Sequence, residues 1–336
     1  MGSGFGMYGL LPAFSKIDEC KVVGICGRIS ERMQRSCKEI GLNRYTNWIE
    51  MLQKENPNAI AIAVIPTYQY QIAKYSLENK IAVFAEKPLT SSLQDSQELD
   101  RIAKKMKLPN MIDFIFPEIP EWQTAKKIID KDEIGGIYNV KVDWNFLSYD
   151  LKNHVKSWKT DVNEGGGALS FYFSHVFYYL EYFIGRIKSM QCNFIFSEKS
   201  LNKGETGIDM SIEFENGCKG KARMDIGYEG LQKHRVEFQG ESGTVTLENN
   251  SCNFVDNFEL IMKNQKGIQK IKPTKVFDLM PDQLEDPRVK IIKPIAERFI
   301  RWCNTGVSAK PDFQDGLRIQ ELIEMARDSN SKLHKL

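Results

Sequence analysis

Two short stretches of the chain carry side chains that could move a proton, Glu86-Lys87-Pro88 and Ser174-His175. Glu86 and Lys87 directly follow an apolar run at residues 81–85 that is typical of a buried strand. Ligands of open α/β sheets bind beyond the carboxyl ends of the strands, so this charged pair stands where a crevice is expected. Pro88 keeps the Lys87 backbone out of the helical region and permits a cis peptide bond. An isolated strand end with solvated charges would show the same tripeptide.

His175 lies about two turns into an apolar helix that we predict after Gly165-Gly166-Gly167. The ordinary pKa of histidine suits acid and base catalysis near neutral pH. A lone histidine on an apolar helix is also common as a hydrogen-bonded core residue, and the sequence leaves both interpretations open. The four histidines show neither HxxH nor HExxH spacing, so we predict no metal site.

Closely spaced glycines open the chain in Gly2-Ser3-Gly4-Phe5-Gly6. Such glycines allow a tight turn that a pyrophosphate can approach, although a flexible tail has the same composition. The apolar run at residues 21–26 lies about 20 residues beyond the glycines, where an acidic residue is expected to bind the ribose. Arg28, Ser30 and Arg32 follow instead, and they suit a 2′-phosphate. The cofactor is therefore predicted to be NADP in preference to NAD.

Alternating strands and helices position these residues in the first part of the chain. Apolar runs at residues 59–65, 81–85 and 111–116 are separated by predicted helices, one of them starting at Ser91 with Gln94 at capping-box spacing. This alternation predicts βαβ units and a parallel sheet, and we assign residues 1–116 to an NAD(P)-binding domain. The central strand of such a sheet directly precedes the glycines, so we expect an apolar strand-forming segment upstream of Met1.

Longer strands with period-two alternation dominate residues 117–336, which we assign to a substrate-binding and oligomerisation domain. The turn Asn216-Gly217 predicts a hairpin, and the strands predict a mostly antiparallel sheet. Helices are expected at residues 289–303 and 315–329. The predicted strands lie at residues 138–146, 190–196, 208–214, 219–227, 235–240 and 244–247.

Composition limits the function classes. The 46 basic and 44 acidic residues are dispersed along the 336-residue chain, which argues against a nucleic-acid partner. Seven scattered cysteines without a CxxC pair favour reduced thiols and a cytoplasmic protein. Membrane insertion and secretion are not predicted, because no apolar run approaches the roughly 20 residues that cross a bilayer and no signal-peptide pattern is present.

Taken in order, these motifs resemble the Gfo/Idh/MocA oxidoreductases, the relatives of glucose-fructose oxidoreductase and inositol dehydrogenase. The resemblance runs over almost the whole chain, from the glycines through Glu86-Lys87-Pro88 and the triple glycine with His175 to Gly240-Glu241-Ser242-Gly243 and Asp315-Gly316-Leu317-Arg318. It implies a Rossmann domain followed by an α/β domain with a large, open, mainly antiparallel sheet. Because one face of that sheet would need covering, we expect a homo-oligomer that forms through it.

The resemblance also implies an activity, the transfer of a hydride between a nicotinamide and a hydroxyl or keto group of a sugar or sugar nucleotide. Substrate would lie between the domains, with Lys87 orienting and polarising its oxygen and His175 as the acid or base. Glu86 would position Lys87. The residues expected to contact the cofactor are Gly2, Gly4, Phe5, Gly6, Arg28, Ser30, Arg32, Pro66, Glu86, Lys87 and Trp158.

Two positions depart from the family pattern. Four residues before the histidine the family usually has an aspartate, and here Phe171 stands there. A histidine often found after the fourth-strand proline is absent, with Tyr68, Gln69 and Tyr70 in its neighbourhood. Some family members bind nucleotide and regulate transcription without turnover. The alternatives are therefore a catalytically silent, nucleotide-binding regulator or scaffold, and a protein that has lost nucleotide binding.

Overall fold

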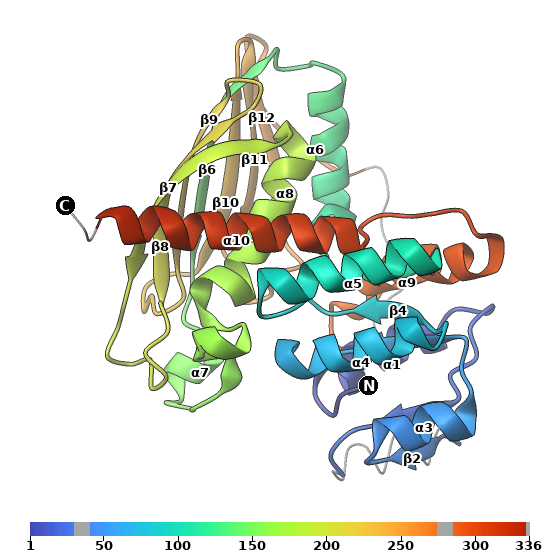
Figure 1. Ribbon diagram of the computed structural model, residues 1–336. Coiled ribbons are helices and arrows are strands. Elements are labelled where there is room, and N and C mark those ends of the chain that lie inside the picture. Colours follow the sequence, from blue (N-terminus) through green and yellow to red (C-terminus); the bar gives the residue numbers. More distant parts are fainter. Residues whose placement is uncertain (30–40, 274–284, 334–336) are drawn as a thin grey trace. The chain divides into compact units, whose positions relative to one another are not determined.

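The computed structural model describes residues 1–29, 41–273 and 285–333, with side chains up to residue 330 (Figure 1). The chain divides into two compact units. The first comprises Met1–Ile115 and the described part of Leu279–Gln320, and the second comprises Phe116 to residue 273 with Glu321 onward. The chain thus returns to the first unit after completing the sheet of the second, a return that the linear sequence pattern did not predict.

The first unit contains only parallel strand pairs among its described residues. Strands β3 (Ala59–Ile62), β4 (Ala82–Ala85) and β5 (Asn110–Ile112) form one sheet, and β1 (Gly24–Cys26) pairs with β2 (Asn43–Tyr45) in another. All residues of β4 are buried, as its unbroken apolar sequence predicts. The sequence did not predict β2, because that strand is three residues long and largely exposed.

Met1 and Gly2 lie between these two sheets. The Met1 amino group donates to the Ala61 carbonyl at 2.5 Å, and the Met1 carbonyl accepts from the Ala63 amide at 2.9 Å. On the other side the Gly2 amide donates to the Cys26 carbonyl at 2.9 Å. These bonds have the pattern of a parallel ladder. The two residues therefore form one rung at the place where a central strand was expected.

The helices of the first unit surround an aromatic core in which Phe14, Phe84 and Phe299 meet edge to face. The N-cap of α5 is Ser92, whose hydroxyl accepts from the Asp95 amide at 3.2 Å. The predicted cap, Ser91, is therefore wrong by one residue. The helices are α1 (Leu11–Ser15), α3 (Trp48–Glu55), α4 (Pro66–Glu78), α5 (Leu93–Met106) and α9 (Val289–Thr305).

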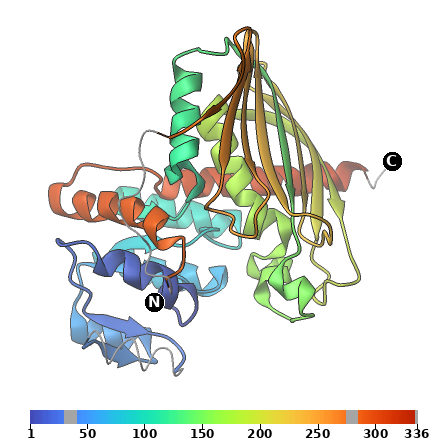
Figure 2. The ribbon, with the colours of Figure 1, turned by 180° about the vertical axis from the view of Figure 1, so that it is seen from behind.

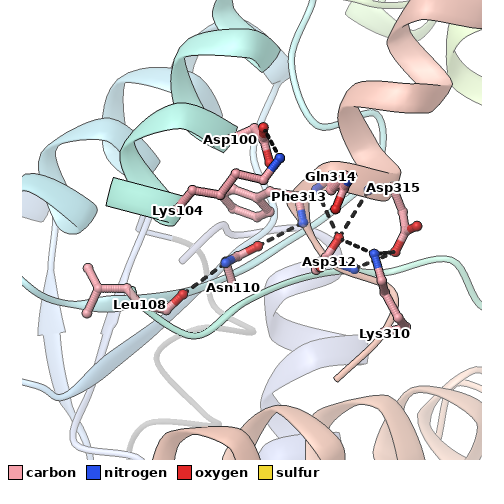
Figure 3. A network of polar contacts seen from close by, with 9 residues as sticks. All are labelled: Asp100, Lys104, Leu108, Asn110, Lys310, Asp312, Phe313, Gln314 and Asp315. Atoms are coloured by element: carbon pink, nitrogen blue, oxygen red, sulfur yellow. Dashed lines mark hydrogen bonds and ion pairs between the residues drawn. The ribbon is translucent and has the colours of Figure 1, made fainter. Parts of the chain in front are cut away.

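A polar network attaches the returning segment to β5 (Figure 3). The Asn110 side chain accepts from the Phe313 amide at 2.8 Å and donates to the Leu108 carbonyl at 2.9 Å. Asp312 accepts the amide of Asp315 at 3.2 Å, which closes the first turn of α10 (Phe313–Leu333). The start of α10 is thus tied to the end of the parallel sheet.

The second unit is built on an eight-stranded sheet in the order β13-β12-β11-β10-β6-β9-β8-β7. Neighbours are antiparallel except β6 and β9, which are parallel. Strands β12 and β13 were not predicted, and β13 is exposed along most of its length. The strands are β6 (Ile137–Asn145), β7 (Ile187–Ile195), β8 (Gly207–Phe214), β9 (Lys219–Asp225), β10 (Lys233–Gly240), β11 (Gly243–Asn249), β12 (Glu259–Asn264) and β13 (Gly267–Ile271).

Helices α6 (Pro120–Asp130) and α8 (Ser174–Ile184) pack on one face of this sheet, and α7 (Tyr149–Lys152), which lies between them in the chain, is near the lower edge of the sheet in Figure 1. Trp122 of α6 contacts Phe183 of α8, which in turn contacts Phe238 of β10. Figure 2 shows the opposite face without a covering helix among the described residues.

That uncovered face of the sheet is charged. Arg235 pairs there with Glu237 and Glu248 at 2.6 and 2.7 Å, and Lys233 pairs with Asp143 at 2.8 Å. The strands therefore alternate between apolar side chains beneath the helices and polar side chains on the open face, as their period-two pattern predicted.

Candidate functional site

The glycine turn of the first unit, residues 2–6, is closely packed at two of its glycines and open at the third. A Cβ on Gly2, whose φ is +110°, would lie 2.1 Å from the Ala63 carbonyl oxygen. A Cβ on Gly6 would lie 2.5 Å from the Met1 carbonyl oxygen, whereas one on Gly4 would meet nothing within 4 Å. Gly2 and Gly6 thus let the backbone pack tightly, and the backbone at Gly4 is open to a phosphate. This turn fits a dinucleotide.

A cation from a distant part of the sequence lies at the same turn. The Arg288 guanidinium stacks over the Phe5 ring at 4.1 Å and lies 5.6 Å from the Tyr8 ring, while Asp286 accepts from it at 2.8 Å. Arg288 directly precedes α9. Arg288 was not predicted as a site residue, since nothing near residue 288 resembles a nucleotide-binding motif. Its charge would attract an anionic ligand.

The end of β1 lies beside the glycine turn. A Cβ on Gly27 would lie 3.0 Å from the Ser3 amide nitrogen, and the exposed Arg28 follows Gly27 directly. Arg28 is therefore distant from the turn in the chain and close to it in space. Ser30 and Arg32 lie outside the described residues, so the predicted 2′-phosphate contacts of these two side chains stay predictions.

One amide side chain fixes the turn at residues 86–89, the Lys87 turn, by hydrogen bonds to its carbonyl groups. Gln69 Nε2 donates to the carbonyl oxygens of Glu86 at 2.6 Å, Leu89 at 3.0 Å and Pro88 at 3.1 Å. The Lys87-Pro88 peptide bond is cis, as the proline permitted. Gln69 was noted in sequence only as a residue that stands where the family often has histidine. Its role as the anchor of this turn could not be predicted, because the carbonyls that it binds are distant in sequence.

A buried carboxyl pair lies directly behind Lys87. Asp113 follows β5, its amide donates to the Ala85 carbonyl at 2.9 Å, and its side chain is hydrogen-bonded to that of Glu86. Burial raises the pKa of Glu86, and burial together with the Glu86 charge raises the pKa of Asp113 well above its usual range. The charges of Lys87 and Arg288 oppose both shifts. Burial and the closeness of the two carboxyl groups thus both favour the protonated form of this pair.

Four predicted residues of the first unit, and Asp113, which was not predicted, lie at one edge of its parallel strands. Gly2 follows the Met1 rung, Arg28 follows β1, Pro66 follows β3, Lys87 follows β4 and Asp113 follows β5. Pro66 is the first residue of α4 and is buried. These positions all follow parallel strands, and the carboxyl ends of such strands are where α/β sheets bind ligands.

In the second unit, His175 is the second residue of α8. Its ring is buried, with 7% of its surface exposed, and meets the edge of the Phe116 ring at 5.1 Å. The segment before it, Ala168–Phe173, forms a π-helix rather than the plain α-helix that we expected. The π-helix alters the spacing along the helix, so Phe171 is not one regular turn before His175.

Phe171 lies in an aromatic and cationic cluster with Trp158. The Phe171 ring contacts the rings of Trp158 at 5.1 Å and Tyr172 at 4.6 Å, and the Lys159 ammonium lies 5.5 Å from its centroid. Trp158, a predicted cofactor contact, is thus brought to the position where the family usually has a carboxylate. The cluster offers flat aromatic surface and positive charge in place of a proton acceptor.

The glycines at residues 165–167 allow the backbone to pack closely around this cluster. A Cβ on Gly166 would lie 2.1 Å from the Trp158 carbonyl oxygen, and one on Gly167 would lie 2.2 Å from Glu205 Oε1. Glu205 accepts from the Leu169 amide at 3.0 Å, and burial raises the pKa of this carboxyl group. The glycines therefore bring the backbone against Trp158 and Glu205 at the start of the π-helix.

A second buried histidine is a core residue. The His234 ring stacks on the Trp144 ring at 4.2 Å, and its Nε2 lies 3.3 Å from the Tyr179 hydroxyl. Burial lowers the pKa of His234 to about 3, so its ring is neutral near neutral pH.

The described residues contain no group of three or more His, Cys, Asp or Glu side chains that could hold a metal ion. Among the helices of the same residues, none is both long enough and apolar enough to span a bilayer.

Family models match both parts of the chain. A model described as the oxidoreductase family with an NAD-binding Rossmann fold matches residues 1–114, and one described as the C-terminal alpha/beta domain of that family matches residues 126–336. An uncharacterized oxidoreductase of Synechocystis sp. is 24% identical over 99% of this chain and 94% of its own length.

Solved structures share the fold. An aldose-aldose oxidoreductase from Caulobacter crescentus, complexed with glycerol, matches with a TM-score of 0.84 and 14% identity over 99% of this chain and 96% of its own. A levoglucosan dehydrogenase in complex with NADH and levoglucosan matches with a TM-score of 0.84 and 18% identity over the same shares of the two chains. At this identity the matches show the fold alone.

Proposed function

The chain belongs to the Gfo/Idh/MocA oxidoreductase family, and from this premise we propose that it transfers a hydride between a nicotinamide and a hydroxyl or keto group of a sugar or sugar nucleotide. The observation that carries the proposal is the single edge of the parallel strands that bears the glycine turn and the Lys87 turn together. Binding of a dinucleotide at such an edge would set its reactive end beside residues that follow neighbouring strands.

The cofactor would be held by the glycine turn. Open backbone at Gly4 would receive the pyrophosphate, and the Arg288 guanidinium over Phe5 would supply compensating charge. The exposed Arg28 beyond β1 supports NADP over NAD, because a guanidinium pairs with a 2′-phosphate. Binding titrations with NADPH and NADH test this preference, which requires NADPH to bind more tightly and Arg28→Ala to remove the difference.

When bound, a nicotinamide accepts or donates the hydride, and the proton must be handled by this chain. The Lys87 ammonium would donate a hydrogen bond to the substrate oxygen and stabilise the negative charge that develops there. Glu86, hydrogen-bonded to Asp113, would fix the Lys87 turn without acting as the base. His175 would take up or release the proton of the substrate hydroxyl. Phe171 leaves these two residues without a third proton-carrying partner at that position.

A sugar substrate is supported by two observations. The levoglucosan dehydrogenase with the same fold was solved with NADH and an anhydrosugar, and Trp158 with Phe171 offers the aromatic surface on which sugar rings commonly pack. We also propose a cytoplasmic homo-oligomer that forms through the open sheet of the second unit. The paired charges on that face would make such an interface polar and sensitive to salt.

Steady-state oxidation of a panel of sugars and sugar nucleotides, followed by NADPH absorbance, tests the function. Lys87→Ala should lower kcat/KM by roughly 10³ and His175→Asn by about 10²–10⁴, because each removes a proton-handling or charge-stabilising group. Lys105→Ala, an exposed lysine of α5, is the matched control and should leave kcat/KM unchanged.

Full turnover in Lys87→Ala would reject the role of this lysine. Cofactor binding without turnover on any member of the panel would favour a silent regulator or scaffold instead.

A further inference from the structure

A buried carboxyl group binds the start of the helix that leads to His175. Glu205 lies just before β8, and 5% of its surface is exposed. Its carbonyl accepts from the Ala168 amide at 2.9 Å, and its side-chain Oε1 accepts from the Leu169 amide at 3.0 Å. One residue, distant in sequence, therefore binds the first two amides of the π-helix Ala168–Phe173.

The π-helix has no capping side chain of its own. Its N-cap residue is Gly167, whose φ is +85° and which makes no side-chain cap bond. A Cβ on Gly167 would lie 2.2 Å from Glu205 Oε1. The first amides of a helix lack partners within the helix, and leaving them unsatisfied in a buried place is costly. Glu205 thus takes both the space and the role of an N-cap side chain.

The hydrogen bonds continue from Glu205 toward His175. Leu169 donates its amide to Glu205, and its carbonyl accepts from the amide of Ser174, five residues later. Such a bond over five residues is the one that defines a π-helix. Ser174 directly precedes His175 in α8. The carboxyl group is therefore joined through Leu169 to the residue before the predicted acid or base.

The β7–β8 connection also holds the turn that carries Trp158. Asn202 Nδ2 donates to Thr160 Oγ1 at 3.2 Å. A Cβ on Gly204 would lie 2.4 Å from the Thr160 carbonyl oxygen, so the two backbones pack tightly there. The connection thus contacts both segments of the aromatic surface, in which the rings of Trp158 and Phe171 lie 5.1 Å apart.

A cation of α10 holds the next residue of the π-helix. Arg327 Nη2 donates to Ser170 Oγ at 2.9 Å. Burial raises the pKa of Glu205, whereas the amides that it binds and the charge of Arg327 lower it. Residues 168, 169 and 170 are therefore each bound from outside the helix. A π-helix is rare, and these contacts are what fixes its register here.

We propose that Glu205 is a positioning residue of the proposed hydride transfer, because its carboxyl group fixes the register of the π-helix and with it the directions of Phe171 and His175. The inference rests on the proposed function. Without this cap the segment can relax to an α-helix, and a shift of one residue rotates side chains by about 100° about the helix axis. The Phe171 ring would then leave Trp158, and His175 would be misaligned.

The test compares Glu205→Ala, Glu205→Gln and Glu198→Ala with the parent chain. Glutamine keeps an oxygen that can accept from the Leu169 amide, and alanine removes it. Glu198→Ala changes an exposed carboxylate of the same connection and is the matched control. For each chain, kcat and KM on the sugar panel, the Kd for NADPH and hydrogen exchange at the Leu169 amide are measured.

Glu205→Ala should speed exchange at the Leu169 amide by about tenfold or more and lower kcat by roughly 10–10², because His175 is misaligned. The Kd for NADPH should stay unchanged, since the glycine turn belongs to the first unit. Glu205→Gln should keep most of kcat, and Glu198→Ala should keep all of it. Parent-like kcat in Glu205→Ala, or equal losses in Glu205→Ala and Glu205→Gln, would overturn the proposal.

A second readout requires no turnover. Overhauser contacts between selectively labelled rings of Trp158 and Phe171 should appear in the parent and in Glu205→Gln and should be lost in Glu205→Ala. Their persistence in Glu205→Ala would overturn the proposal. A parent chain that oxidises no sugar would reject the proposed function, and these contacts would still decide whether Glu205 fixes the helix register.

Glu205→Asp serves as the milder variant should the alanine variant fail to fold. It keeps the charge, and its side chain is one methylene too short to reach the Leu169 amide. Loss of the Trp158–Phe171 contact and of kcat is expected in this variant as well. Unchanged contacts and unchanged kcat in Glu205→Asp would contradict the positioning role.

Discussion

The two predicted catalytic residues occupy opposite kinds of surroundings. Lys87 lies in a turn that polar groups hold, with the Gln69 amide on three carbonyls and a carboxyl pair behind it. His175 lies in aromatic surroundings, with the Phe116 ring at 5.1 Å. One unit fixes its functional backbone by hydrogen bonds, and the other fixes its functional helix by packing of rings. Substitutions that remove polar groups should therefore perturb mainly the surroundings of Lys87. Substitutions that change side-chain volume should perturb mainly the surroundings of His175.

The largest effect is expected from Trp122→Ala in the second unit. The Trp122 side chain is fully buried and contacts the rings of Phe116, Tyr179 and Phe258. Its truncation should lower the unfolding free energy of this unit by about 3–5 kcal/mol through loss of burial and a residual cavity. Urea unfolding followed by near-UV circular dichroism measures the loss. Tyr149→Ala, at a side chain that is 70% exposed, is the control and should cost little.

The stability of the second unit is expected to depend strongly on pH in the acid range because of His234, which lies in the same aromatic core. Its pKa is lowered to about 3 in the folded state, so between its ordinary value near 6.5 and pH 3 the unfolded chain binds more protons. Stability should fall as the pH falls through this window, at up to about 1.4 kcal/mol per pH unit. His234→Phe should remove this slope and His154→Asn, at an exposed position, should not. An unchanged slope in His234→Phe would contradict the assignment.

A moderate effect is expected from Gln69→Met in the first unit. The substitution keeps the volume of the side chain and leaves the carbonyls of Glu86, Pro88 and Leu89 without their donor. A cost of about 1–3 kcal/mol follows from unsatisfied buried acceptors. Turnover should fall as well, because the Lys87 turn loses its anchor. Thermal unfolding and kcat are measured beside Tyr68→Met, at the exposed neighbouring position; equal loss in both variants would remove the anchoring role.

The smallest effect is expected from Asp113→Asn, and it has the opposite sign. The raised pKa of Asp113 means that the folded state binds more protons than the unfolded state above the usual carboxyl range. Stability should therefore fall as the pH rises through that window. The amide carries no charge, so the variant should be more stable than the parent at pH 8 and should lose this slope. Urea midpoints at pH 5 and pH 8 test it, with the exposed Asp18→Asn as the control.

The local sequence pattern was sufficient to predict many of the strands and turns of the fold. Buried runs such as the one in β4 and the alternating strands β8 and β9 lie where their periodicities placed them, and Asn216-Gly217 forms the turn between the latter two. Short or exposed strands, β2 and β13, carry no such pattern and were not predicted. The π-helix before His175 was not predicted from the sequence either, because its residues are as apolar as those of an α-helix.

The sequence by itself determined the family, the parallel strands of the first unit and the mostly antiparallel strands of the second, because these depend on residue type and short-range spacing. Only the tertiary structure brought Gln69 to the Lys87 turn, Asp113 to Glu86, and Arg288 to Phe5. These are contacts between residues distant in sequence, and they depend on which strands are neighbours and where the chain returns.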